Sequence, residues 1–196
     1  MKRLLLPFIF LVCSICAYAE KPIEYFSVGD PLKFDGTKYY LAWSAHPKDH
    51  YYTQEYLPKG ESLDNFNSML SVLVIFLDIP VSDMVQAKIS ELEQRKQNDP
   101  ITNYKLFEND GEYLLDFIVS DSYTGDFNTV EVNVYHYQPA TVNGKQAVIL
   151  SFYSGRAYGD DITPFMLSIP KKREARYKGL LDLNLKPVFD DIQSSR

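Results

Sequence analysis

The clearest pattern in the chain is a two-residue alternation followed by a tight-turn signal. Val130, Val132 and Val134 fall at every second position, so they share one face of an extended strand. Asn143-Gly144 follows, and this pair favours the two-residue turn that joins antiparallel strands. Residues 146–153 then return as a second apolar strand. The pattern predicts a long hairpin within an antiparallel sheet that buries the valine face.

The other strands are expected in segments rich in aromatic or β-branched residues. Residues 20–38 carry several prolines and glycines and are expected to cross the surface before the first strand. Asn109-Asp110-Gly111 is a second hairpin signal further along the chain. The remaining strands are predicted at residues 39–45, 51–57, 72–76, 104–108 and 112–120.

Helices are predicted between and after these strands. Ser62 and Ser82 are expected to cap two of them. Their apolar faces would be Leu63, Phe66 and Leu70 in the first helix and Val85, Ile89 and Leu92 in the second. Residues 162–169 are predicted as a short helix that Pro170 ends, and residues 171–183 as the final helix. Strands joined by hairpins with inserted helices indicate an α+β fold, with an antiparallel sheet of six or seven strands.

The first 19 residues have the pattern of a cleaved secretory signal. Lys2 and Arg3 precede an apolar run that is too short to span a bilayer comfortably. Ala17-Tyr18-Ala19 places small residues where a signal peptidase cuts. The chain is therefore expected to comprise a signal at residues 1–19, a single α+β domain at residues 20–189 and a polar tail at residues 190–196.

Both cysteines, Cys13 and Cys16, lie within the predicted signal. A mature chain beginning at Glu20 would have no disulfide, no thiolate metal site and no cysteine nucleophile. Lipidation of Cys16 is the alternative, although no small residues precede it as a lipoprotein-processing site requires. An exported domain without cysteines indicates a bacterial envelope protein, and we expect it in the periplasm.

The charge balance excludes one class of partner. The chain has 20 basic and 26 acidic residues, and removal of Lys2 and Arg3 would change its net charge from −6 to −8. An acidic chain repels phosphate backbones, so we expect no nucleic-acid partner. No stretch after the signal is long and apolar enough to predict a membrane helix. Sequence signatures of serine hydrolases, zinc proteases and nucleotide-binding loops are absent, so we expect no cofactor and no metal.

Aromatic side chains crowd the first predicted hairpin, which makes it the candidate partner-binding region. If several share an exposed face, they would form a rigid recognition patch for a protein or a glycan. The alternative is that about half of them pack on the core. His46 and His50 would suit a metal ion only on a helix, whereas Pro47 predicts a hairpin here. The candidate residues are Tyr39, Trp43, His46, His50, Tyr51 and Tyr52.

His136 continues the valine face beyond Val134. We expect a partly buried histidine with one satisfied ring nitrogen. The alternative is a catalytic base of a hydrolase, with Asp116 or Glu131 from a neighbouring strand within hydrogen-bond reach. A polar cleft with that arrangement would favour the enzyme.

A basic run follows Pro170 and comprises Lys171, Lys172, Arg173, Arg176 and Lys178. We interpret it as the solvated face of the last helix. Contact with an acidic partner or with lipid headgroups is the alternative.

One stretch resembles a known family. It comprises Glu55-Tyr56-Leu57-Pro58, Gly60-Glu61, Asn65-Phe66 and Met69-Leu70-Ser71-Val72. This series resembles the opening of bacterial PsbP-like domains, whose fold is shared by the extrinsic photosystem II protein and a yeast Ran-binding import factor. Phe66 stands where the family pattern has a tryptophan. The resemblance covers about a tenth of the chain and implies an α/β/α sandwich with a docking or accessory role.

These observations favour a non-catalytic binding or accessory module of the envelope. Its partner would be a protein or another envelope component. The alternative is a periplasmic hydrolase that uses His136 with neighbouring carboxylates.

Overall fold

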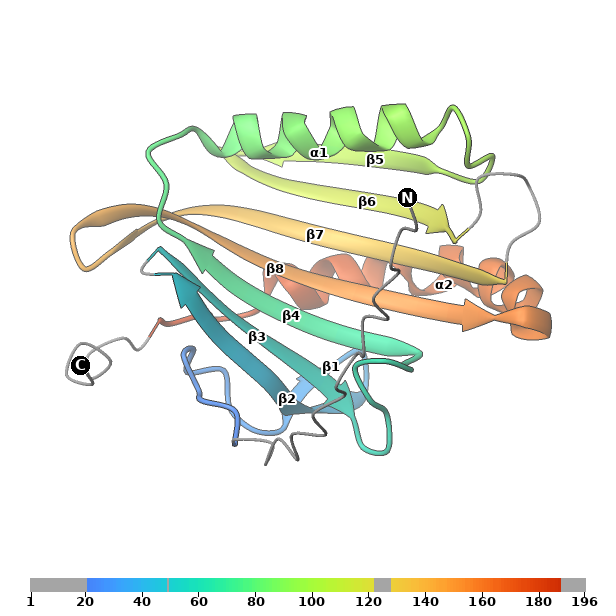
Figure 1. The fold of residues 1–196 in the computed structure, drawn as a ribbon, viewed down its shortest axis with the longest axis horizontal. Coiled ribbons are helices and arrows are strands. Elements are labelled where there is room, and N and C mark those ends of the chain that lie inside the picture. Colours follow the sequence, from blue (N-terminus) through green and yellow to red (C-terminus); the bar gives the residue numbers. More distant parts are fainter. Residues whose placement is uncertain (1–20, 49, 122–127, 188–196) are drawn as a thin grey trace, which may run out of the picture.

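The computed structural model describes residues 21–48, 50–121 and 128–187, and these form one antiparallel sheet with two α-helices (Figure 1). The strands are β1 (Leu32–Phe34), β2 (Thr37–Lys48), β3 (Tyr51–Pro58), β4 (Ser68–Ile75), β5 (Asn103–Asn109), β6 (Glu112–Ser120), β7 (Thr129–Val142) and β8 (Lys145–Tyr158). The helices are α1 (Val81–Arg95) and α2 (Ile162–Leu181), with a 3₁₀ turn at Gly159–Asp161 before α2.

The strand order is β1-β2-β3-β4-β8-β7-β6-β5. The predicted α+β class is confirmed, but the described residues contain eight strands rather than six or seven. The additional strand is β1, three residues long, in the segment expected to cross the surface. Among the described residues, no helix combines the length and the apolar character needed to cross a membrane. The predicted signal at residues 1–19 and the predicted tail at residues 190–196 lie outside them.

The β7–β8 hairpin forms the centre of the sheet. Asn143 and Gly144 both have positive φ, at 50° and 75°, which the two-residue hairpin turn requires. Val130, Val132 and Val134 are buried on one face, as the alternation predicts. Each strand is 14 residues long, because the pairing continues up to the turn and, in β8, also beyond the predicted end at Tyr153.

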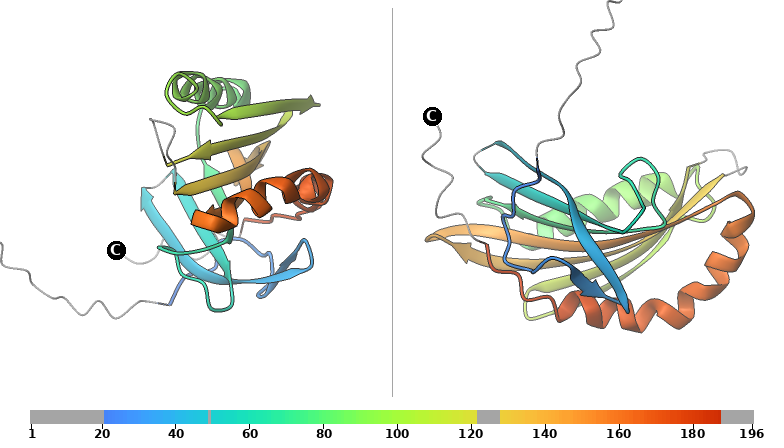
Figure 2. Two further views of the ribbon diagram at one scale, coloured as in Figure 1. Left: turned by 90° about the vertical axis from the view of Figure 1, so that its right-hand side faces the viewer. Right: turned by 90° about the horizontal axis from the view of Figure 1, so that it is seen from below.

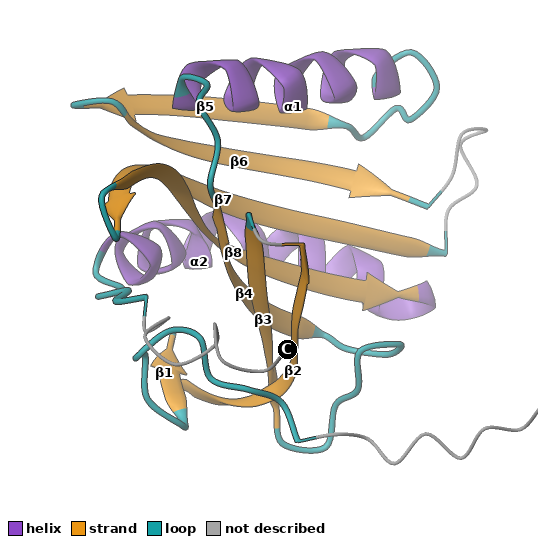
Figure 3. Cartoon of the chain, turned by 60° about the vertical axis from the view of Figure 1, so that its left-hand side comes forward, coloured by secondary structure: helices purple, strands orange, loops and turns teal. Residues whose placement is uncertain are grey.

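The two helices cover opposite faces of the sheet (Figures 1, 2 and 3). We call these the α1 face and the α2 face. On the α1 face, Val85 and Leu92 of the helix pack with Leu73 and Leu150 of the sheet. On the α2 face, the core includes Leu180 of α2 and residues from the chain before β2, and Figure 2 shows α2 curving along the sheet.

Helix α2 is continuous, so the predicted break at Pro170 is wrong. Proline inside a helix removes one hydrogen bond and costs about 3 kcal/mol. However, Ile162, Ile169 and Arg176 recur seven residues apart and Leu180 follows, and all four are buried. Because this face packs on the sheet on both sides of Pro170, tertiary contacts outweigh the local cost.

The predicted helix after Ser62 is also wrong, since residues 59–67 form a loop. Ser62 and Asn65 exchange two backbone hydrogen bonds of 3.1 Å, which close a tight turn. The Glu61 carboxylate then accepts a hydrogen bond from the amide of Ser68 at 3.1 Å, where β4 begins. Side chains of this kind satisfy backbone groups locally and therefore compete with a helix.

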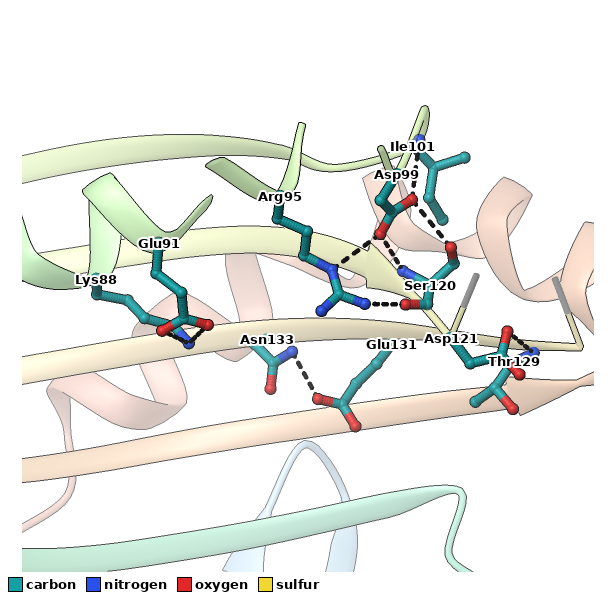
Figure 4. A network of polar contacts seen from close by, with 10 residues as sticks. All are labelled: Lys88, Glu91, Arg95, Asp99, Ile101, Ser120, Asp121, Thr129, Glu131 and Asn133. Carbon is teal, nitrogen blue, oxygen red and sulfur yellow. Dashed lines mark hydrogen bonds and ion pairs between the residues drawn. The ribbon is translucent and has the colours of Figure 1, made fainter. Parts of the chain in front are cut away.

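A buried polar cluster ties the end of α1 to β6 (Figure 4). We call it the Asp99 cluster; it comprises Arg95, Asp99 and Ser120. Arg95 Nε lies 3.0 Å from the fully buried Asp99 carboxylate, which also accepts from the Ser120 amide at 2.7 Å and the Ser120 hydroxyl at 2.9 Å. Arg95 Nη2 donates to the Ser120 carbonyl oxygen. Burial alone would raise the pKa of Asp99, but these donors outweigh it, and the pKa lies below its usual value.

Candidate functional site

A row of cross-strand neighbours crosses the α2 face and ends near the edge of the sheet. Phe107 pairs with Leu114, Leu114 with His136, and His136 with Ser151. Paired residues on one face of an antiparallel sheet lie side by side. The row therefore places His136 two strands inward from the edge strand β5.

A pocket of about 370 Å³ lies over the outer part of this row, between the β5–β6 hairpin, β7 and the last turns of α2. We call it the His136 pocket. Its apolar and aromatic walls are Phe107, Tyr113, Leu114, Tyr177 and Leu181. The rings of Phe107 and Tyr177 meet edge to face, with centroids 5.5 Å apart. The volume is at the lower end of the range of small-ligand sites.

His136 forms a pair with Glu112 at this pocket. The histidine is 1% exposed, and its Nε2 lies 2.9 Å from the carboxylate oxygen Oε2 of Glu112, which is 41% exposed. The other carboxylate oxygen lies 3.5 Å from Gln138 Nε2. His136 Nδ1 is buried without a hydrogen-bond partner. One satisfied nitrogen matches the expectation, although burial is more complete than expected.

Asp116 and Glu131, the carboxylates that the sequence analysis considered as partners of His136, bind other residues. Asp116 accepts from the Tyr177 hydroxyl and lies 2.6 Å from Arg173 Nε. Burial, and then the hydrogen bond to Asp116, raise the pKa of Tyr177 well above its usual value, so the phenol keeps its proton. Glu131 pairs with Arg156. Glu112 therefore takes the place expected for Asp116 or Glu131 beside His136.

Three of the six candidate partner-binding residues face the α2 side of the sheet. Tyr39 is 2% exposed, and its hydroxyl donates to Ser68 Oγ at 3.0 Å. Tyr52 is half-buried and stacks on His46 with ring centroids 3.8 Å apart. His46 Nδ1 lies 3.0 Å from a backbone carbonyl oxygen in the facing strand. Tyr39 is thus a core residue, and His46 is held within the hairpin.

The other three candidates lie apart from these. Trp43 pairs with Glu55 on the α1 face and is 40% exposed. Tyr51 is half-buried against the α1 core, and His50 is exposed. The six side chains do not form one exposed patch, and their role in partner binding stays a prediction. No three His, Asp or Glu side chains of residues 21–48, 50–121 and 128–187 gather in a group that could hold a metal ion.

The basic run does not form a single solvated face, which corrects the interpretation above. Arg173 pairs with Asp116, and Arg176 is only 2% exposed. Arg176 lines a second pocket of about 310 Å³, whereas the neighbouring Tyr177 lines the His136 pocket. The sequence analysis named Arg176 in the basic run but missed its burial, although its seven-residue spacing from Ile169 would have placed it on the buried face of an unbroken helix.

Comparison with known proteins places the chain in a family. A search of the curated proteins finds no match. A family model matches residues 26–185, far more than the stretch that suggested PsbP-like domains, and it is not a PsbP-like model. The predicted resemblance is therefore wrong. Since the match spans most of the chain, the protein belongs to this uncharacterised family.

Proposed function

We propose that the protein is a non-catalytic binding module of the bacterial envelope, and that the His136 pocket receives an apolar side chain of a partner protein. One observation carries the proposal. Phe107 and Leu181 stay 48% and 53% exposed at the mouth of a pocket with apolar and aromatic walls. Large apolar side chains exposed around a pocket are typical of interaction surfaces.

The open edge of β5 supports a protein segment as the occupant. In the part of the chain that the structure describes, β5 ends the strand order, so its outer edge pairs with no strand. Most of its residues are exposed. An extended segment can pair with such an edge through its backbone and insert alternate side chains into nearby pockets. The Glu112 carboxylate, held by His136, offers an acceptor for a donor of that segment.

The geometry of His136 favours binding over catalysis. Nε2 is engaged by Glu112 and Nδ1 is buried, so neither nitrogen presents a free lone pair to the pocket. The described residues that line the pocket include no serine, threonine, cysteine or lysine that would serve as a nucleophile.

Photo-cross-linking from α2 tests the proposal in cells. A photoreactive phenylalanine analogue at Leu181 should give a discrete adduct with a partner protein. The matched control is Leu167, which is 73% exposed on the same helix and does not line the pocket. Equal adducts from both positions, or none from Leu181, would contradict the proposal.

A pair of substitutions on β5 sharpens the test. Phe107→Glu places a charge at the pocket and should abolish the adduct formed from Leu181. Leu106→Glu is the control, because Leu106 is 36% exposed and pairs with Leu115 on the other face of the strand. Loss of the adduct in both variants would place the partner elsewhere.

The envelope location is tested by the mature N-terminus. The predicted signal implies that mass spectrometry of the exported protein finds Glu20 as the first residue. A lipid-modified Cys16 as the first residue would overturn the periplasmic location.

The His136–Glu112 pair is the observation that favours the alternative, a hydrolase. Such an enzyme would activate water at His136 with Glu112 as its orienting carboxylate. We expect the purified protein to hydrolyse a panel of ester and glycoside substrates no faster than buffer does. Hydrolysis that disappears in His136→Gln while the variant stays folded would establish the enzyme instead.

A further inference from the structure

The second pocket, which we call the Arg176 pocket, lies in the notch where β8 extends past the start of β4. It opens between the β1–β2 hairpin, the end of β8 and α2. Three of its lining residues, Tyr39, Tyr153 and Arg176, are only 2%, 5% and 2% exposed. Its buried lining therefore combines a cation with two phenols.

Arg176 is a buried cation without a counter-ion among the described residues. Its Nε and Nη1 atoms are buried and have no hydrogen-bond partner. The guanidinium lies 4.5 Å from the centroid of the Tyr153 ring, and this contact offsets only part of the cost of removing a charge from water. Arg173, three residues earlier, pairs with Asp116 instead. An unpaired guanidinium that lines a pocket is suited to an anion from outside the chain.

The surrounding packing holds Arg176 in place. The Tyr153 ring beneath it stacks on Phe34, with centroids 5.5 Å apart and planes 17° apart. Gly179 leaves room for Phe34, because a Cβ there would lie 2.7 Å from the Phe34 ring. Gly155 leaves room for the Tyr153 hydroxyl, which would lie 2.6 Å from a Cβ at that position. Two glycines thus permit the stack on which the guanidinium rests.

The pocket also supplies hydroxyl donors. The Tyr39 hydroxyl donates to Ser68 Oγ at 3.0 Å, which leaves the Ser68 proton available to a ligand. Burial raises the pKa of Tyr39 to about 12 and also raises that of Tyr153. Both phenols therefore stay protonated at neutral pH, and neither carries a negative charge that would neutralise Arg176.

We propose that the Arg176 pocket binds the carboxylate group of a small ligand, with the Arg176 guanidinium as its counter-ion. The planar fork of arginine matches the two oxygens of a carboxylate. The other charged residues around the pocket are Arg156, which pairs with Glu131, and the exposed Lys172, Asp35 and Asp161. Those two acidic residues repel a doubly charged phosphate more than a singly charged carboxylate, so the rim favours the carboxylate. This site is separate from the His136 pocket and does not depend on the partner proposed there.

Thermal unfolding of the purified protein tests the site, with sodium acetate as the probe and sodium chloride at equal ionic strength as the reference. Acetate at about ten times its Kd should raise the unfolding midpoint by about 3 to 5 °C relative to chloride. Arg176→Met should lose this response. In chloride the variant should unfold at or above the wild-type midpoint, because the substitution removes an unpaired buried charge.

Control variants separate the site from general effects of charge. Lys172→Met removes a positive charge from the rim and should keep most of the acetate response. If Arg176→Met does not fold, Arg176→Lys takes its place, since it keeps the charge and loses the fork. A weaker acetate response in Arg176→Lys would support the proposal, and an unchanged response would overturn it.

The remaining outcomes are equally decisive. A wild-type protein that responds to acetate no more than to chloride would overturn the proposal. So would an equal acetate response in Arg176→Met. Sodium phosphate forms the last arm, and a midpoint shift larger than that of acetate would overturn the choice of a carboxylate.

Discussion

The two helices contact the sheet through arginines in opposite states, a half-buried Arg95 on α1 and a buried Arg176 on α2. Arg95 at the end of α1 belongs to the Asp99 cluster, where a buried carboxylate and a carbonyl oxygen receive its donors. Arg176 near the end of α2 has two buried nitrogens without partners. Both side chains lose hydration, but only that of Arg95 is compensated within the described chain. The donors of Arg95 at the end of α1 are therefore satisfied within the protein. For Arg176 on α2, we propose that an anion from outside the chain supplies the missing acceptor.

The largest expected effect on stability comes from removing the carboxylate of the Asp99 cluster at the end of α1. Asp99→Ala leaves Arg95 Nε and the Ser120 amide without their acceptor and should lower the free energy of unfolding by about 3 to 5 kcal/mol. Urea denaturation of wild type and variant measures the difference. The control Asp64→Ala, at an exposed loop position, should change it by less than about 0.5 kcal/mol. Similar losses in both variants would mean that the Asp99 cluster has no special role.

Low pH should reduce the difference in unfolding free energy between the wild type and Asp99→Ala. The folded-state pKa of Asp99 is below its unfolded value of about 3.9, so its ionised form stabilises the protein above that pH. The contribution is lost as the pH falls through the folded-state pKa. We expect the gap between wild type and Asp99→Ala to stay constant from about pH 7 to pH 5 and to narrow below about pH 4. A gap that stays unchanged at pH 3 would contradict the assignment.

The packing of α2 on the sheet depends on the close contact between Gly179 and Phe34, whereas the end of α1 is held by the Arg95–Asp99 ion pair. Gly179→Ala pushes a methyl group against Phe34 and costs about 1 to 3 kcal/mol, of which better helix propensity returns about 1 kcal/mol. We expect a small net loss of stability in chemical denaturation, together with a weaker acetate response, because the Tyr153 ring moves with Phe34. Glu174→Ala, at an exposed position of the same helix, should leave the acetate response unchanged.

Removal of an exposed ion pair should have the smallest effect on the free energy of unfolding. Lys88 and Glu91 on α1 lie 2.9 Å apart, with side chains 22% and 60% exposed. Removal of the pair by Glu91→Ala should change the free energy of unfolding by less than about 0.5 kcal/mol. A loss comparable to that of Asp99→Ala would show that burial does not explain the difference between these pairs.

Local signals in the sequence predicted the strands well. Alternating valines and the Asn143-Gly144 turn act between neighbours, so the β7–β8 hairpin and its buried face follow from them directly. The helix expected after Ser62 and the break expected at Pro170 failed for two different reasons. Local hydrogen bonds of Glu61, Ser62 and Asn65 compete with a helix after Ser62, which the apolar spacing does not reveal. Helix α2 continues through Pro170 because it packs on distant parts of the chain, which no local pattern contains.

The candidate sites were only partly predictable. The alternation placed His136 on the buried face, but its partner Glu112 depends on the β6–β7 register, which no tight turn specifies in the sequence. Arg176 falls on the buried face only if α2 continues through Pro170, so one wrong boundary concealed the second pocket. Arginines are usually exposed, and composition therefore pointed away from burial.

The difference between Arg95 and Arg176 can be observed directly by NMR of the arginine Nε–H groups in the ¹⁵N-labelled protein. Addition of sodium acetate should shift the Arg176 Nε–H signal until it saturates, while the Arg95 signal, already bonded to Asp99, stays in place. Assignment follows from the loss of each signal in Arg176→Lys and Arg95→Lys. An Arg176 signal that does not respond to acetate, or an Arg95 signal that shifts equally, would contradict the account.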